Sequence, residues 1–209
     1  LFTIGSRYIL ASNQPIEQVG FFELSSSISN VVLPLVSVFA LVMGPKLVRD
    51  TSRIDAYYRK VGSGSMLLVT GFSLTMLLFN EFILRTLLGR EFALQTSWPL
   101  IIMLLALPFV ALFTLHTTLL SSLRLTRWAA VLLLGVGLTE VLLNVVLTPT
   151  YSAAGAAASV FAGYALAYVL AVAVLWRACR LDFAAPLKQV GLFLAFLLAY
   201  YFGGFTSWP

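Results

Sequence analysis

The stretch TEVLLNVVLTPTYSAAGAA, residues 139–157, places two unlike features next to each other. Glu140 and Asn144 interrupt a run that is otherwise Val and Leu, and soon afterwards the chain becomes almost entirely Ala, Ser and Gly. A continuous apolar run is typical of a helix in lipid, whereas small residues let a second helix approach closely. The stretch therefore predicts two membrane helices joined by a tight turn around Pro149.

The composition of the whole chain agrees with a membrane environment. Of its 209 residues, 60% are hydrophobic and 10% are charged, and the mean hydropathy is +0.98. Soluble domains carry about 25% charged residues. A soluble sphere of this size has too little interior to hide so much apolar surface. We therefore expect an integral membrane protein.

Six apolar runs are long enough, at about 20 residues, to cross a bilayer as helices. Because the runs are continuous rather than alternating, they predict helices and not strands. The fold class is thus an all-α polytopic membrane helix bundle, a single transmembrane domain over residues 1–209 that is a fragment of a larger protein. The predicted helices are 21–44, 62–83, 97–120, 128–147, 155–176 and 187–205, with residues 1–11 as the end of a seventh.

The gaps between these runs indicate the orientation. Ten of the thirteen Lys and Arg residues fall in every second gap, at 45–61, 121–127 and 177–188. The positive-inside rule places these three loops in the cytoplasm of a multi-pass membrane protein. Basic residues so dispersed do not form a phosphate-binding face, so nucleic acid is not an expected partner.

A polar stripe follows the first full helix. Glu23, Ser26, Ser27, Asn30 and Pro34 recur at spacings of three and four, which places them on one helix face. One interpretation is the wall of a transport cavity. The other is hydrogen bonding between helices, with Glu23 reaching the outer headgroups. The sequence leaves both open.

Glu140 lies too deep in its predicted helix for its carboxyl group to reach the membrane surface from the helix end. It is seven residues before Leu147, about 10 Å below the predicted outer end of its helix. Asn144, one turn later, shares its face. The carboxyl group either pairs with Asn144 or a neighbouring helix, or it faces water. We expect a cavity-facing Glu140, as is usual for acids within membranes.

Small residues recur every four positions in the next helix, at Gly155, Ser159, Gly163 and Ala167. This spacing forms one helix face that predicts close helix packing. The chain has no nucleotide-binding glycine motif, no paired cysteines and a single histidine, His116, for which we expect a structural hydrogen bond. We therefore predict no catalytic residue, metal site or cofactor, and no enzyme.

Several segments together carry a resemblance to a known family. LLNVVLTPTYSAAGAAASVFAGY resembles the oligosaccharide and polysaccharide exporters of the multidrug/oligosaccharidyl-lipid/polysaccharide superfamily. QVGFFELSSSISN, LLGREFALQTSWPLIIMLL and LLSSLRLTRWA resemble further segments of that family in the same order. The resemblance spans nearly the whole chain and corresponds to the C-terminal half of a fourteen-helix protein. Glu140 departs from it, since the family often has Asn at that position.

The resemblance implies one lobe of a two-lobe transporter around a cavity that opens alternately to each side. It implies a bacterial inner membrane location, a missing N-terminal lobe and a lipid-linked oligosaccharide of the undecaprenyl-diphosphate type as substrate. Candidate residues of the substrate path are Arg7, Glu23, Ser27, Asn30, Glu140 and Asn144. Arg7 is the one residue here that resembles a cavity-side cation.

Three functions follow as hypotheses. The first is a flippase or exporter of lipid-linked oligosaccharide in polysaccharide or O-antigen (lipopolysaccharide) biosynthesis. The second is a cation-coupled multidrug exporter that uses Glu140 as its proton or sodium site. The third is a non-transporting membrane scaffold of a glycan-assembly complex.

Overall fold

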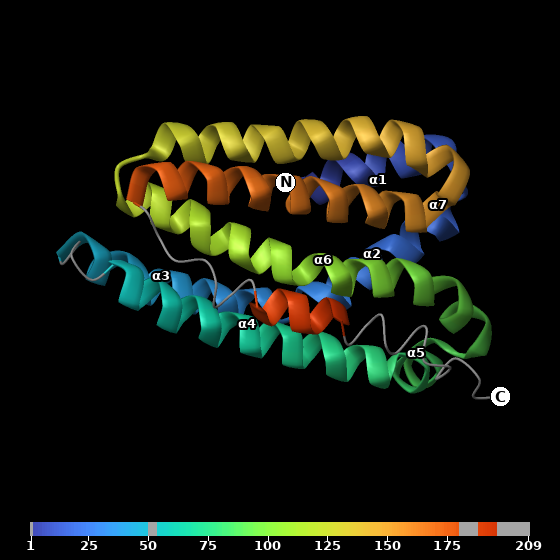
Figure 1. Cartoon of the computed structure of the whole chain (residues 1–209). Helices are drawn as coiled ribbons and strands as arrows, with labels where there is room; N and C mark the ends of the chain where they lie inside the picture. The colour runs from blue at the N-terminus through green and yellow to red at the C-terminus, as the bar shows by residue number, and fades with distance from the viewer. Residues whose placement is uncertain (1, 50–53, 180–187, 196–209) are drawn as a thin grey trace.

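The computed structural model describes residues 2–49, 54–179 and 188–195, all of them within or between α-helices. The chain forms a helix bundle in which α6 lies between α3 and α4 on one side and α7 on the other (Figure 1). Residues 188–195 form a further helical segment. The seven labelled helices are α1 (Phe2–Asn13), α2 (Ile16–Asn30), α3 (Leu33–Arg49), α4 (Ile54–Leu78), α5 (Asn80–Leu88), α6 (Arg90–Ser122) and α7 (Thr126–Cys179).

Helix α7 is two antiparallel helices that are continuous except at one residue. Ser152 has a φ of 52° and a ψ of −132°, and the chain reverses its direction there (Figure 1). Gln14, the residue after α1, helps to hold this bend: Ser152 Oγ donates to Gln14 Oε1 at 3.0 Å, and Gln14 Nε2 donates to the carbonyl of Pro149 at 3.3 Å. We call residues 126–151 the first half of α7 and residues 153–179 the second half.

Helices α2 and α3 replace the single helix predicted at 21–44, a run in which Pro34 is able to kink the helix. They meet at a bend of 41° after Asn30. Pro34 explains the bend, because it has no N–H to donate to the carbonyl of Asn30 four residues earlier and its ring crowds that carbonyl. The pair Ile16–Asn30 and Leu33–Val42 is apolar enough to count together as one broken membrane span.

Other helix boundaries also differ from the apolar runs. α4 begins at Ile54 rather than at residue 62, because a polar segment extends the helix beyond its lipid-facing part. The segment 84–96, which is long enough for a short helix, holds the end of α5, and α6 begins directly after Gly89. Gly89, with φ +83°, separates the two helices in a backbone conformation that favours glycine. The predicted helix 187–205 corresponds to the helical residues 188–195, and 196–209 lie outside the described residues.

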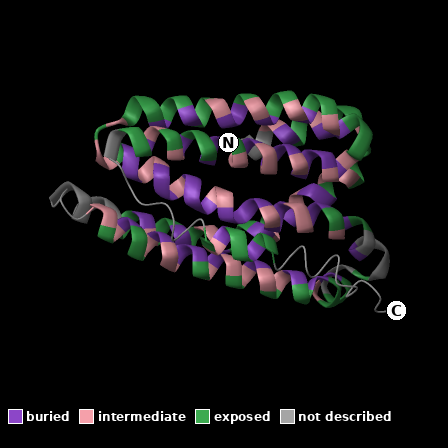
Figure 2. Ribbon diagram, viewed as in Figure 1, coloured by how far each residue is buried: buried purple, intermediate pink, exposed green. Residues whose placement is uncertain are grey.

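Three described helices are long and apolar enough to cross a membrane, and the number rises to four if the bent α2–α3 pair is counted as one span. One of the three covers Thr126–Arg177, which at 52 residues is long enough for two crossings of about 20 residues. The span in α6 is 61% buried within the bundle, against 33% for α4 and 28% for α7. α6 is therefore the central helix, as the buried residues along it in Figure 2 show.

Candidate functional site

Two sides of the bundle differ in what they expose. The first half of α7 presents a broad apolar surface that includes Trp128, Leu134, Leu138, Leu142 and Val146; it runs along one edge of the bundle (Figure 2). Helices α1 and α2 expose polar side chains among the apolar ones. We call this second surface the α1–α2 face; its exposed polar residues include Arg7, Ser12, Asn13, Glu17, Ser27 and Asn30. Lipid suits the first surface, and a polar path suits the second.

An ion pair joins the two helices of the α1–α2 face. The guanidinium group of Arg7 on α1 contacts the carboxylate of Glu23 on α2, with the two side chains 46% and 29% exposed. A pair this accessible to solvent contributes only about 0–1 kcal/mol. Another anion that reaches this surface can therefore compete with Glu23 for the guanidinium group.

A buried chain of hydrogen bonds lies behind that surface. Thr148 Oγ1 donates to Asn144 Oδ1 at 2.8 Å, Asn144 Nδ2 donates to Ser6 Oγ at 2.7 Å, and Ser6 Oγ donates to Glu140 Oε1. None of these four side chains is more than 1% exposed. We call Ser6, Glu140, Asn144 and Thr148 the Glu140 chain. It joins α1 to the first half of α7.

The spacing of α7 explains how this chain forms. Glu140, Asn144 and Thr148 are four residues apart and so lie on one helix face, which Ser6 meets from α1. We expected a cavity-facing Glu140, but the structure places it between helices, which is the alternative of pairing with a neighbouring helix. Its second oxygen, Oε2, is buried and has no hydrogen-bond partner among the described residues.

The small residues of the second half of α7 face the first half. A Cβ added at Gly163 would lie 3.4 Å from the carbonyl oxygen of Val136 and 3.6 Å from Cβ of Glu140. At Gly155 it would lie 2.4 Å from the carbonyl oxygen of Leu147. Ser159 and Ala167 are also buried, at 0% and 2%. The absence of bulk along this face is what lets the two halves of α7 lie against each other.

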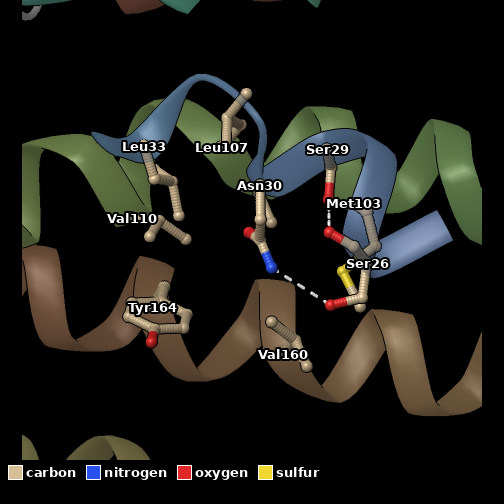
Figure 3. Close-up of a pocket in the computed structure, with 10 residues that line it drawn as sticks. Ser26, Ser29, Asn30, Leu33, Met103, Leu107, Val110, Val160 and Tyr164 are labelled. Atoms are coloured by element: carbon tan, nitrogen blue, oxygen red, sulfur yellow. Dashed lines mark hydrogen bonds between the residues drawn. The ribbon is translucent and has the colours of Figure 1, made fainter. Parts of the chain in front are cut away.

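A pocket of about 160 Å³ opens beside the bend between α2 and α3. Its polar lining comes from Ser26, Ser29, Asn30 and Tyr164, and Asn30 Nδ2 donates to Ser26 Oγ at 3.1 Å. Asn30 points from α2 toward the second half of α7, where Tyr164 lies (Figure 3). Its apolar lining includes Met103, Leu107, Val110 and Val160. Ser27, from the same predicted stripe, is exposed and does not line this pocket.

His116 occupies a separate buried cluster with two tyrosines. Its Nε2 lies 2.7 Å from the hydroxyl of Tyr58 on α4. Its ring stacks on Tyr58 and on Tyr168 of α7, with centroids 5.7 and 5.5 Å apart. The cluster joins α4, α6 and α7. Among the described residues, no group of three His, Cys, Asp or Glu side chains is placed to hold a metal ion.

Several residues of these sites were missed in the sequence, among them Thr148, Ser6, Gln14 and Tyr164. Thr148 had a signal, because it continues the four-residue spacing of Glu140 and Asn144. Ser6 and Gln14 had none, since their partners lie more than 130 positions away. Tyr164 lies among small and apolar residues whose pattern indicates packing alone.

Comparison with known proteins adds one match. Neither a protein-family model nor a curated protein matches the sequence. Among solved structures, the chain is similar to the lipid II flippase MurJ in an inward closed conformation, with a TM-score of 0.78 and 15% sequence identity. The match covers 100% of this chain and 45% of the MurJ chain. The chain therefore shares its fold with less than half of the MurJ chain.

This match confirms the all-α polytopic membrane bundle. The chain spans 45% of the length of MurJ, so the activity and partners of a whole transporter are not read from this chain alone. At 15% identity, the similarity to MurJ concerns the fold and not the substrate. The assignment to the oligosaccharide-exporter branch stays a prediction.

Proposed function

We propose that this chain is the C-terminal lobe of a transporter that flips or exports lipid-linked oligosaccharide for polysaccharide or O-antigen biosynthesis. The observation that carries the proposal is that the whole chain shares its fold with part of a lipid flippase. The N-terminal lobe would supply the other wall of the cavity. Transport would then proceed by alternating access, as the two lobes rock about a central site.

The α1–α2 face supports a substrate with an anionic headgroup. Arg7 is a half-exposed guanidinium on α1, and guanidinium groups bind phosphate through paired hydrogen bonds. An undecaprenyl-diphosphate headgroup would displace Glu23 from Arg7. The lipid tail would stay among apolar residues and the bilayer. We further propose a bacterial inner membrane location, with the loops around 45–61, 121–127 and 177–188 in the cytoplasm.

Deletion and complementation test this proposal in the parent organism. Deleting the gene should cause a glycan-assembly defect, with lipid-linked oligosaccharide accumulating on the cytoplasmic side. The wild-type gene should restore export, and Arg7→Gln should restore it poorly. Arg59→Gln is the matched control, because Arg59 also forms an exposed ion pair, with Asp55, but on α4. A deletion strain with normal surface glycan would contradict the proposal.

A second candidate, a cation-coupled multidrug exporter, is favoured by one observation: the buried carboxyl of Glu140 with one oxygen unpartnered among the described residues. Under this hypothesis, Glu140→Gln should abolish the dependence of drug efflux on a proton or sodium gradient. Glycan assembly should then be normal. A scaffold without transport activity predicts a third outcome, in which alanine at Glu23, Asn30, Glu140 and Asn144 together leaves glycan export intact.

A further inference from the structure

The pocket beside the α2–α3 bend lies where a membrane helix loses its regular hydrogen bonding. Pro34 leaves the carbonyl of Asn30 without its helical donor. Interrupted backbone at membrane depth is tolerated where it is buried in protein or lines a polar cavity. The pocket provides such a cavity, because Asn30 itself lines it together with two serines and Tyr164. The bend and the pocket are therefore one feature.

An amphiphilic substrate of the proposed kind has three parts: a diphosphate, a lipid tail and a sugar. The lining of this pocket suits one of them. Among the described residues, no charged side chain lines the pocket, so it does not suit a diphosphate, which requires cations. The amide of Asn30 and the hydroxyls of Ser26, Ser29 and Tyr164 make it too polar for a lipid tail. A neutral group that carries both hydroxyls and an apolar C–H surface matches the mixed lining. A sugar ring has that chemistry.

Polar groups in the pocket have hydrogen-bonding capacity to spare. Asn30 uses one amide N–H on Ser26 Oγ, which leaves its second N–H and its carbonyl oxygen. The hydroxyl of Tyr164 makes no hydrogen bond to another described residue, and its ring packs edge-on against Phe113 at 5.6 Å between centroids. These groups are thus able to donate to and accept from a bound hydroxyl.

Position connects the pocket to the Arg7–Glu23 pair. Asn30 follows Glu23 by seven residues on α2, two helical turns or about 10 Å along the axis. A headgroup held at Arg7 would therefore have the pocket within a short distance along the same helix face. At about 160 Å³ the pocket is smaller than the roughly 300 Å³ at which sites for drug-sized ligands begin. It admits a single ring, not an oligosaccharide.

We propose that this pocket binds the first sugar of the lipid-linked substrate, the one attached directly to the diphosphate, an inference that rests on the proposed function. Asn30 and Tyr164 are the residues that recognise its hydroxyls. The transporter then distinguishes substrates by their proximal sugar.

A difference between two ligands tests the pocket separately from the headgroup. Dissociation constants are measured for the purified full-length protein with undecaprenyl diphosphate, and with the same lipid carrying one glucose, galactose or N-acetylglucosamine. At least one sugar should bind about tenfold more tightly than the bare lipid, which corresponds to one or two neutral hydrogen bonds. Tyr164→Phe and Asn30→Leu should each remove most of that advantage and leave affinity for the bare lipid unchanged.

Tyr168→Phe is the matched control, because Tyr168 lies one turn further along α7, is buried, and its hydroxyl has no hydrogen-bond partner among the described residues. It should retain the full sugar advantage. Affinity for the bare lipid also reports that each variant is folded. The pocket assignment is wrong if the glycosylated lipid binds no more tightly than the bare lipid, or if its tighter binding persists in both variants. The pocket would then be only a hydrated cavity beside the helix bend. If the bare lipid itself does not bind the wild type, the proposed function fails as well.

Discussion

The hydroxyl of Ser6 on α1 donates a hydrogen bond to the carboxylate of Glu140 on α7, from a position 134 residues away in the chain. The next residue, Arg7, points from a different face of α1 and contacts Glu23 on α2. Consecutive residues of α1 thus contact two acids, one buried in the bundle and one on the α1–α2 face. A shift of α1 would change both contacts together.

Removal of the Ser6 hydroxyl should destabilise the bundle. Ser6→Ala leaves both Glu140 Oε1 and Asn144 Nδ2 without their buried partner, which costs about 1–3 kcal/mol per unsatisfied group. Ser12→Ala on the same helix is the control, because Ser12 is exposed and its hydrogen bonds, to the carbonyl of Ile9 and from the side-chain amide of Asn13, lie on the surface. Its effect should stay within about 0.5 kcal/mol. Thermal unfolding in detergent compares the two variants, and equal melting temperatures would contradict the buried chain.

Replacing either partner of the ion pair on the α1–α2 face should change the affinity for the diphosphate headgroup, and the two changes should have opposite signs. Arg7→Gln removes a charge-assisted hydrogen bond of about 1.5–3 kcal/mol, so undecaprenyl diphosphate should bind roughly ten- to a hundredfold more weakly. Glu23→Gln removes the competing carboxylate and should strengthen binding by up to about fivefold, the range of an exposed ion pair. If the dissociation constant rises in both variants, or falls in both, Glu23 and the lipid diphosphate do not compete for Arg7.

Packing at the bend of α7 should tolerate no added methyl group at Gly155. A Cβ there would lie 2.4 Å from the carbonyl oxygen of Leu147, and overpacking of this kind costs about 1–3 kcal/mol. Gly135→Ala in the first half of α7 is the control, since a Cβ at Gly135 meets no atom within 4 Å. Gly155→Ala should lower the melting temperature, and Gly135→Ala should leave it unchanged or raise it slightly. The opposite order would mean that the two halves are not packed as described.

The hydrogen bond between Tyr58 and His116 should stabilise the packing of α4 against α6. Tyr58→Phe keeps the stacked ring but removes the hydroxyl that lies 2.7 Å from His116 Nε2, a loss of about 1–3 kcal/mol for a buried group. Tyr57→Phe removes a hydroxyl from the adjacent position as a control. In denaturant or thermal unfolding, Tyr58→Phe should be clearly less stable than Tyr57→Phe. If the two variants are equally stable, the contact with His116 does not stabilise the fold.

The sequence predicted some of this architecture for identifiable physical reasons. Continuous apolar runs located the membrane helices, and Glu140 stood out because a charge within such a run is costly. Helix ends were predicted less well. α4 begins at Ile54, where polar residues continue a helix beyond its apolar segment, and Pro34 bends a run that reads as a single helix.

Partners across the fold could not be predicted in the same way. Ser6 is one of many serines, and no local pattern connects it to Glu140. Tyr164 contributes to the pocket because the close packing of α7 brings it opposite Asn30 on α2. Such contacts depend on how α7 turns back at Ser152, a bend that Gln14 and Gln18 help to hold from a distant part of the chain.

Reconstituted transport tests the central claim most directly. The full-length protein is placed in liposomes that contain a fluorescent undecaprenyl-diphosphate-linked oligosaccharide, and a membrane-impermeant reagent quenches the lipid in the outer leaflet. The account predicts that the protein exposes the inner-leaflet fraction to the reagent, and that Arg7→Gln slows this exposure at least tenfold while Arg59→Gln does not. Liposomes in which the wild-type protein leaves the inner-leaflet fraction protected, under every ion gradient applied, would contradict it.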